Sequence, residues 1–281
     1  MDWYQPFGAT ASPPWTVRTG LSHAGLSVLA LPPGGSTTID TGEQEMLVVP
    51  LAGGAHVECG GRRYELAGRA DVFAGRTDFA YLPRRSDATI GSASGGRFAV
   101  AAGPCGRDLP FRYGPAGQVP VELRGAGRCS RQVNNLAAAG GFECDRLIVV
   151  EVLTPDGNWS SYPPHKHDEH SEHESELEEI YYFEIGGDGA GYHRVYGTPG
   201  RPIDVLAEVR TGDVVLVPYG WHGPSMAAPG YPMYYLNVMA GPRPERAWRI
   251  RDDPAHAWIR SSWDGMPVDD RLPMGEAEGA S

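Results

Sequence analysis

The sequence has almost no lysine. Lys166 is the only lysine among 281 residues, so nearly all of the 24 basic side chains are arginines. This scarcity excludes a Schiff-base mechanism at any residue other than Lys166. Basic residues are also outnumbered by 35 acidic ones, which gives a net charge of -11. Such a chain does not attract a phosphate backbone by bulk electrostatics, and we expect no nucleic-acid partner.

Cysteines and long apolar segments are scarce too. The 4 cysteines lie far apart, and no two of them form a Cys-x-x-Cys pair that would indicate a zinc knuckle or a redox motif. No segment approaches the ~18 apolar residues of a membrane span, and the first residues resemble neither a basic leader nor a signal-peptide core. We therefore expect a reduced, cytoplasmic protein with no membrane partner.

Long segments with a helical period of 3.6 residues are missing as well. Short apolar runs instead alternate with glycine and proline, for example at residues 25–31, 45–51, 79–83 and 97–101. This spacing is typical of a β-sandwich or β-barrel. A hydrophobic content of 41% is ample for a buried core. The sequence therefore predicts a mainly β fold.

A weak internal repeat predicts two β-barrels in tandem. Residues 45–54 resemble residues 179–187, with Glu45 aligned with Glu179. Further along, residues 79–86 parallel residues 214–222. Glycine and proline concentrate near the middle of the chain, as in a connection between domains. We expect an N-terminal barrel over residues 1–115, and a C-terminal barrel with a tail over residues 116–281.

Histidines in the second barrel have the spacing of metal ligands. His165 and His167 are one residue apart, so both imidazoles point to the same face of a strand, while Lys166 points away. His222, in a later Pro-Tyr-Gly-Trp-His turn, can supply a third nitrogen. The acidic spacer that follows His167 contains two more histidines, which we expect to be solvated.

A glutamate from the next strand completes the predicted set. Glu179 shares a strand face with Tyr181 and Phe183, whereas Glu178 points the other way, so Glu179 is the expected ligand. Three histidines and a carboxylate suit a divalent metal ion, with zinc favoured and manganese, iron and nickel left open. The first barrel lacks the histidines, and we expect it to bind no metal.

Two tandem barrels with this ligand set resemble a bicupin. Residues 157–168, 177–182 and 234–241 are closely similar to the 5-deoxy-glucuronate isomerases of bacterial inositol catabolism. The sister family comprises ketol-isomerases of pectin-derived deoxy-uronates. The resemblance covers essentially the whole chain. It implies a metal-dependent aldose-ketose isomerisation of 5-deoxy-D-glucuronate, a small sugar acid, to 5-deoxy-2-keto-D-gluconate without a redox cofactor.

Such a reaction needs a base and a group that binds the substrate carboxylate. A metal ion with open positions can polarise the aldehyde and acidify the neighbouring proton. Glu178, Tyr181, Tyr219 and Tyr235 lie close in sequence to the ligands or on neighbouring strands, and each is a candidate base.

An arginine fork matches the two oxygens of a carboxylate. Arg131, Arg243 and Arg246, which flank the second barrel, are the candidates. Two other readings stay open, namely a metal-dependent cupin oxygenase and a non-catalytic sugar-binding cupin. The sequence leaves the oligomeric state undetermined, and a homo-oligomer is compatible with it.

Overall fold

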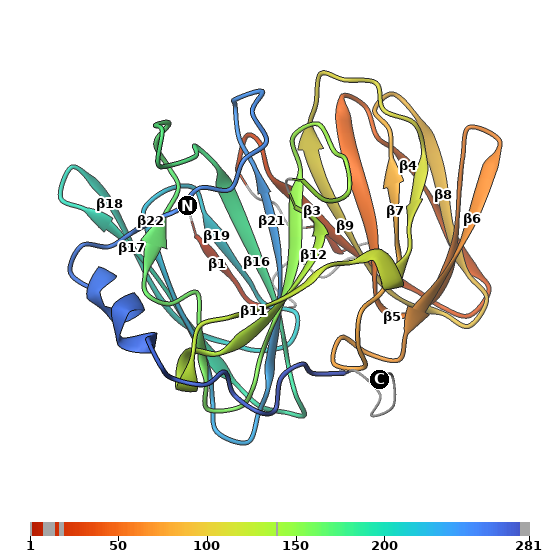
Figure 1. Cartoon of the computed structure of the whole chain (residues 1–281). Coiled ribbons are helices and arrows are strands. Elements are labelled where there is room, and N and C mark those ends of the chain that lie inside the picture. Colours follow the sequence, from red (N-terminus) through yellow and green to blue (C-terminus); the bar gives the residue numbers. More distant parts are fainter. Residues whose placement is uncertain (1, 8–14, 17–19, 139, 276–281) are drawn as a thin grey trace.

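Two β-barrels stand side by side in the computed structural model of the chain (Figure 1). The structure describes residues 2–7, 20–138 and 140–275, and the backbone of residues 15–16. Strands account for nearly all of the regular structure, so the predicted mainly β fold is confirmed. Among the described residues, no helix combines the length and the apolar character needed to cross a membrane.

The first barrel is built from nine strands, whose central order is β10-β7-β5-β9-β3-β2. Their bounds are β2 (Trp15–Thr16), β3 (Gly25–Leu31), β4 (Gly35–Asp40), β5 (Gln44–Cys59), β6 (Arg62–Arg69), β7 (Phe79–Leu82), β8 (Asp87–Ser92), β9 (Gly96–Pro104) and β10 (Arg112–Gly114). β5 is long enough to take part in both faces of this barrel, pairing with β9 and β7 at its start and with β6 and β8 at its end.

Two sheets form the second barrel. The larger has the order β1-β19-β16-β21-β13-β12-β11, and the smaller has the order β18-β17-β20-β15-β22 with β14 paired to β20. The larger sheet consists of β1 (Tyr4–Gln5), β11 (Val121–Arg124), β12 (Arg131–Ala137), β13 (Ile148–Thr154), β16 (Glu178–Ile185), β19 (Val214–Val217) and β21 (Met233–Ala240). The smaller consists of β14 (Trp159–Ser160), β15 (His165–Lys166), β17 (Gly191–Thr198), β18 (Arg201–Val209), β20 (Trp221–Ala227) and β22 (Arg251–Asp252).

The connections contain three short 3-10 helices. They are η1 (Ala116–Gln118), η2 (Gly127–Cys129) and η3 (Ala257–Trp263).

Strand β1 is an exception to the division of the chain at its middle. Although it precedes every strand of the first barrel, it pairs with β19, with Tyr4 opposite Val215.

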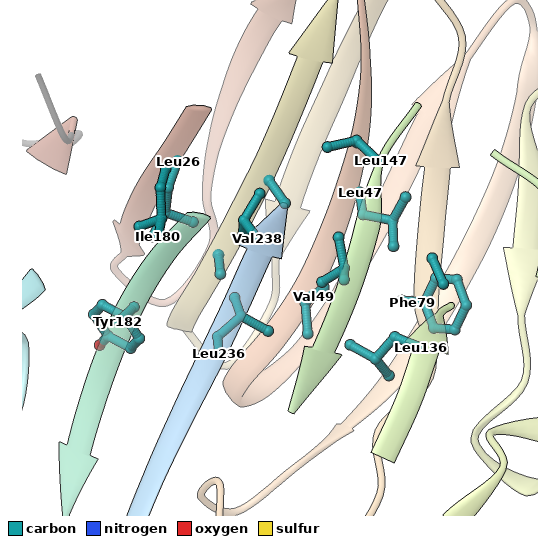
Figure 2. Close-up of a cluster of buried hydrophobic side chains, with 14 of the residues drawn as sticks. Leu26, Leu47, Val49, Phe79, Leu136, Leu147, Ile180, Tyr182, Leu236 and Val238 are labelled. Atoms are coloured by element: carbon teal, nitrogen blue, oxygen red, sulfur yellow. The ribbon is translucent and has the colours of Figure 1, made fainter. Parts of the chain in front are cut away.

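The largest buried cluster lies between the barrels rather than inside either one. Figure 2 shows Leu26 and Val49 of the first barrel packed toward Ile180 and Val238 of the second. Each barrel also has its own interior cluster. A strand with one face on each cluster needs apolar side chains on both sides, and this explains why β16 and β21 carry buried apolar residues on both faces.

Glutamates at the barrel boundary bind across it in both directions. Glu45, on β5, accepts hydrogen bonds from the backbone N–H groups of residues 145–147, which lead into β13. Glu178, on β16, accepts hydrogen bonds from the N–H groups of residues 22–24, which lead into β3. Each barrel therefore fixes the start of a strand in the other. We call these two carboxylates the reciprocal glutamates.

The predicted alignment of Glu45 with Glu179 is wrong by one residue. Glu179 pairs with Val217 of β19, and in the first barrel the residue that pairs with the corresponding Leu82 is Met46. Met46 points into the interior of its barrel as Glu179 does, whereas Glu45 faces the boundary. Glu45 thus corresponds to Glu178. A weak repeat can slide by one residue, and in a strand this exchanges the two faces.

Candidate metal centre and active site

Three of the four predicted ligands converge inside the second barrel. The donor atoms of His167, Glu179 and His222 all lie within 4.8 Å of one another, and all three side chains are buried. β16 supplies Glu179 on the same interior face as Tyr181 and Phe183, as predicted from strand parity. His222 lies on β20 of the opposite sheet, so the two sheets meet at this cluster.

His165 lies directly beside these three side chains. Strand pairing sets His165 opposite His222, and their ring centroids are 4.5 Å apart. His165 is buried, and burial holds the pKa of its imidazole well below the usual range, with the nearby His222 and His167 adding to the effect. The imidazole is therefore neutral at physiological pH, the form that a metal ligand requires.

Backbone carbonyls orient all three imidazoles in the same way. The Nδ1 atoms of His165, His167 and His222 lie 3.2, 3.2 and 3.1 Å from carbonyl oxygens of Pro163, Leu177 and Gly220. Nδ1 therefore donates in each ring, and a neutral ring then carries its lone pair on Nε2. This arrangement of a donated Nδ1–H and a free Nε2 is common in histidines that bind metals.

The Nε2 atoms of two of these rings face the glutamate. Those of His167 and His222 lie 3.0 and 3.1 Å from Oε2 of Glu179. Lone pairs on both partners would repel, so a proton or a cation must lie between them. Burial raises the pKa of Glu179, but the contacts with His167 and His222 outweigh burial and lower it, which keeps the carboxylate ionised. Among the described residues, Glu179 Oε1 has no hydrogen-bond partner, and the contact of His222 Nε2 with Oε2 lacks the geometry of a hydrogen bond. Ionised, unsatisfied and convergent donors fit a divalent metal ion.

The segment around the His-x-His pair behaves as the alternation predicts. Lys166 points away from the cluster, and its ammonium is 2.6 Å from Asp168 and 2.7 Å from Glu174. Asp168 in turn accepts the backbone N–H of Gly220, close to His222. The acidic spacer thus holds the two ligand-bearing segments together. His170 and His173 are exposed.

Two of the four candidate bases lie outside the cluster. Glu178 points to the boundary between the barrels and is occupied by the N–H groups of residues 22–24, so the structure does not support it as a base. Tyr219 directs its hydroxyl to the carbonyl of Pro202, 3.0 Å away, on the outside of the barrel. Proximity in sequence is misleading for both, because Glu178 faces the side of β16 opposite to Glu179, and Tyr219 lies in the bend between β19 and β20.

The other two candidates, Tyr181 and Tyr235, lie in the barrel interior. Both hydroxyls are 3.1 Å from Oγ of Ser161, and the Tyr181 ring centroid is 6.1 Å from that of His222. Burial raises the pKa of both phenols above the ordinary value, and the charge of Glu179 raises that of Tyr181 further. Both phenols are therefore protonated at neutral pH, so they are hydrogen-bond and proton donors rather than ready bases.

The three candidate arginines have different surroundings. Arg246 is saturated by backbone, since its guanidinium donates to the carbonyls of Ala137, Ala138, Phe142 and Leu147. Arg243 is largely exposed and lies 3.4 Å from the carboxylate of Glu176. Neither position is suited to binding a substrate inside the barrel. Of the three, only Arg131 is buried, and it shares a face of β12 with Val133 of the interior cluster.

One polar side chain of the interior was not predicted from the sequence. His193, on β17, is fully buried, its ring centroid is 4.4 Å from that of Tyr181, and its Nδ1 is 2.7 Å from Oγ of Ser225. Burial, with the nearby His222, lowers the pKa of His193 to about 3. Its Nε2 has no partner among the described residues. The signal in the sequence is that His193 shares a strand face with Val195, whereas Tyr192 and Arg194 lie on the other face.

Comparison with known proteins identifies relatives along nearly the whole chain. The KduI/IolB family matches residues 13–259. The 5-deoxy-glucuronate isomerase of Geobacillus thermodenitrificans is 44% identical over 247 residues, which is 86% of this chain and 88% of that protein. The 5-deoxy-glucuronate isomerase of Bacillus subtilis strain 168 is 39% identical over 253 residues, covering 87% and 90% of the two chains.

Solved structures extend the comparison to the fold. An IolB-like protein from Salmonella typhimurium LT2 superimposes with a TM-score of 0.84 at 34% identity, over 92% of this chain and 99% of that one. Oxalate decarboxylase from Lactobacillus farciminis reaches a TM-score of 0.64 at 12% identity, over 95% and 97% of the chains. At such low identity the second likeness shows the fold alone, and that fold is the bicupin that the sequence predicts.

Proposed function

Because this chain belongs to the KduI/IolB family, we propose that it is a 5-deoxy-glucuronate isomerase, which converts 5-deoxy-D-glucuronate to 5-deoxy-2-keto-D-gluconate. The observation that carries the proposal is the identity of 39 to 44% with isomerases of that name over 86% or more of the chain. The cluster of His167, Glu179 and His222 inside the second barrel supports it independently. The name of these enzymes implies a role in inositol catabolism. We propose that this protein acts in that pathway in the cytoplasm.

We propose that His165, His167, Glu179 and His222 hold one divalent metal ion, with zinc favoured. An ion bound there would act as a Lewis acid that polarises the substrate carbonyl. The four side chains supply three nitrogens and one oxygen, so a substrate oxygen would bind by expanding the coordination of the ion beyond four. In the corresponding interior of the first barrel, Met46 stands where Glu179 stands in the second. We therefore propose that the first barrel binds no metal.

Two protonated tyrosines beside the cluster can donate hydrogen bonds to a substrate. Tyr181 and Tyr235 share Ser161 as a hydrogen-bond partner, and burial keeps both phenols protonated. Phenols in this state can donate to sugar oxygens on which negative charge develops. The surrounding apolar cluster, to which Phe183 and Val217 belong, excludes bulk solvent from these hydrogen bonds. We propose that Tyr181 and Tyr235 stabilise the developing charge.

Turnover of 5-deoxy-D-glucuronate by the purified protein tests the proposal. The expected result is formation of the 2-keto product, with about one divalent ion per chain by elemental analysis. The same assay under argon distinguishes an isomerase from a metal-dependent oxygenase, because an isomerase consumes no oxygen. Activity that requires oxygen, or binding of the sugar acid without turnover, would refute the proposal in favour of the oxygenase or the sugar-binding cupin.

Turnover in deuterium oxide reports the path of the hydrogen that moves between C2 and C1. We expect deuterium at C1 of the product, because a proton that leaves C2 passes through groups that exchange with solvent. The label can be measured by proton NMR at partial conversion. Complete retention of the substrate hydrogen in both product and recovered substrate would favour a direct hydride shift instead.

A further inference from the structure

A cavity of about 560 Å³ opens at one edge of the second barrel. It lies between β11 and the segment that leads into β22. These two strands are the edge strands of the larger and the smaller sheet of this barrel. Its charged lining consists of three arginines and two carboxylates, contributed by Glu122, Arg124, Arg131, Asp252 and Arg260.

Two of the arginines have carboxylate partners within the cavity wall. Arg124 lies 2.8 Å from Glu122, and Arg260 donates to Asp252 at 2.7 Å. For Arg131, no carboxylate within ion-pair distance occurs in the part of the chain that the structure describes. Arg131 donates to the carbonyl of Cys129 at 3.1 Å and lies 5.8 Å from the ring centroid of Trp263. The lining therefore carries one uncompensated positive charge, and it belongs to Arg131.

The isolation of this charge is costly to the protein. Arg131 is only 8% exposed, and moving an unpaired guanidinium out of water is strongly unfavourable. Burial lowers the pKa of Arg131 to about 10, and the neighbouring Arg124 and Arg260 act in the same direction. The group still carries its charge at neutral pH. A buried cation without an anion in a cavity wall indicates that the anion comes from a ligand.

Strand geometry directs Arg131 toward the site rather than toward the first barrel. On β12, Arg131 and Val133 share a face, and Val133 belongs to the interior cluster of the second barrel. Burial raises the pKa of Tyr235, and the charge of Arg131 is near enough to act in the opposite direction. Tyr235 is connected through Ser161 to Tyr181, which lies beside the cluster of histidines and Glu179. On the other side of the cavity, Asp252 pairs directly with His165 in the strand register.

From this arrangement we propose that Arg131 binds the carboxylate of the substrate, at the end of the sugar chain remote from the aldehyde. The inference rests on the proposed function, because that substrate carries an aldehyde at one end and a carboxylate at the other. The aldehyde end would lie at the histidine cluster, and the carboxylate would neutralise Arg131. A guanidinium fork suits this task because it presents two parallel donors to two oxygens. Arg131 then selects sugar acids over neutral sugars.

Two substrates and two variants test the role of Arg131. The substrates are 5-deoxy-D-glucuronate and 5-deoxy-D-glucose, which has a hydroxymethyl group in place of the carboxylate. The variants are Arg131→Met, which keeps the length of the stem, and Arg131→Lys, which keeps the charge and loses the fork. Arg63→Ala, on the exposed surface of the first barrel, is the control. kcat and KM are measured for each protein together with the metal content and the midpoint of thermal unfolding.

We expect Arg131→Met to raise KM for the sugar acid at least 30-fold and to leave kcat/KM for the neutral sugar within threefold of wild type. The KM of Arg131→Lys for the sugar acid should fall between those of wild type and Arg131→Met, and Arg63→Ala should match wild type. The unfolding midpoint of Arg131→Met should not fall, because the substitution removes an unpaired buried charge. An unchanged KM for the sugar acid, or an equal loss for both substrates, would overturn the role of Arg131 while leaving the isomerase intact. Absence of turnover by the wild-type protein would instead refute the proposed function, and this inference with it.

Discussion

Glu179 is the residue on which the proposed metal centre depends most. Its carboxylate contacts two of the three imidazoles and is the one negative charge among the donors. Glu179→Gln removes that charge, and the amide presents an N–H group that cannot bind a cation. We expect loss of the metal ion and a fall in kcat/KM of more than about 100-fold. Elemental analysis and the isomerase assay measure the two effects.

The exposed spacer provides the matched control for Glu179. His173→Ala alters a histidine that lies in the same segment of the sequence but is solvated, and it should retain both metal and activity. Full metal occupancy in Glu179→Gln would show that Glu179 is not a ligand. Metal loss in His173→Ala would show that the spacer contributes donors that the geometry does not indicate.

His193 offers a prediction about acid stability. The unfolded chain takes up a proton near pH 6.5, whereas the folded protein resists protonation down to about pH 3. Between these values the unfolded state binds more protons, so stability is lost as the pH falls from 6.5. We expect His193→Gln, which does not titrate, to lose about 2 kcal/mol less than wild type between pH 7 and pH 4.5.

Urea unfolding of both proteins, with a chelator present throughout, measures this difference. The chelator removes the contribution of metal binding, and the ligand histidines titrate equally in both proteins. Identical pH dependence of the two unfolding free energies would mean that His193 is protonated or solvated in the folded state.

At the scale of the strand, the reciprocal glutamates determine where two strands begin. The carboxylate of Glu178 accepts hydrogen bonds from Ser22, His23 and Ala24. Glu178→Gln replaces the charged acceptor with a neutral amide, so these hydrogen bonds lose their charge-assisted strength. We expect a loss of about 1 to 3 kcal/mol in the free energy of unfolding, with metal content unchanged. Denaturant unfolding provides the measurement.

The control for Glu178 is the nearby Glu176. Its side chain is 40% exposed and has one long contact with Arg243, so Glu176→Gln should change the unfolding free energy by less than about 0.5 kcal/mol. Equal effects of the two substitutions would show that the backbone hydrogen bonds of Glu178 contribute nothing particular. Loss of metal in Glu178→Gln would reverse the assignment of the two faces of β16.

Strand periodicity explains which parts of this arrangement could be predicted. A strand has only two faces, so the neighbours Tyr181 and Phe183 were sufficient to place Glu179 in the interior. The same rule cannot identify what meets the opposite face, because the partner of Glu178 lies 156 residues away at Ser22. It also cannot single out His193, whose role depends on contacts with strands that are distant in sequence.

At the scale of the whole molecule, one buried ion pair crosses the boundary between the barrels. Arg69 of β6 pairs with Glu151 of β13, and Tyr234 donates to the same carboxylate at 2.9 Å. Removal of one partner leaves the other charged and buried. We expect Glu151→Gln to destabilise the protein by about 3 to 5 kcal/mol, as measured by denaturant unfolding.

The double variant Arg69→Met with Glu151→Leu separates the value of the pair from the cost of an isolated charge. It removes both charges, and we expect it to recover most of the stability lost in Glu151→Gln. Both barrels should unfold in one transition in every variant, because the largest apolar cluster lies between them. Two separate transitions, or no recovery in the double variant, would contradict this view of the boundary.

The reciprocity of Glu45 and Glu178 gives the chain the character of a dimer made from a single polypeptide. Each barrel presents to the other the same kind of carboxylate, at corresponding places on β5 and β16, as two identical subunits related by a twofold axis would. A true dimer dissociates on dilution, but here the two partners are joined covalently and remain together at any protein concentration. The first barrel therefore acts as a permanently attached subunit. Its sequence can change outside the surface that contacts the second barrel, provided that this surface is kept.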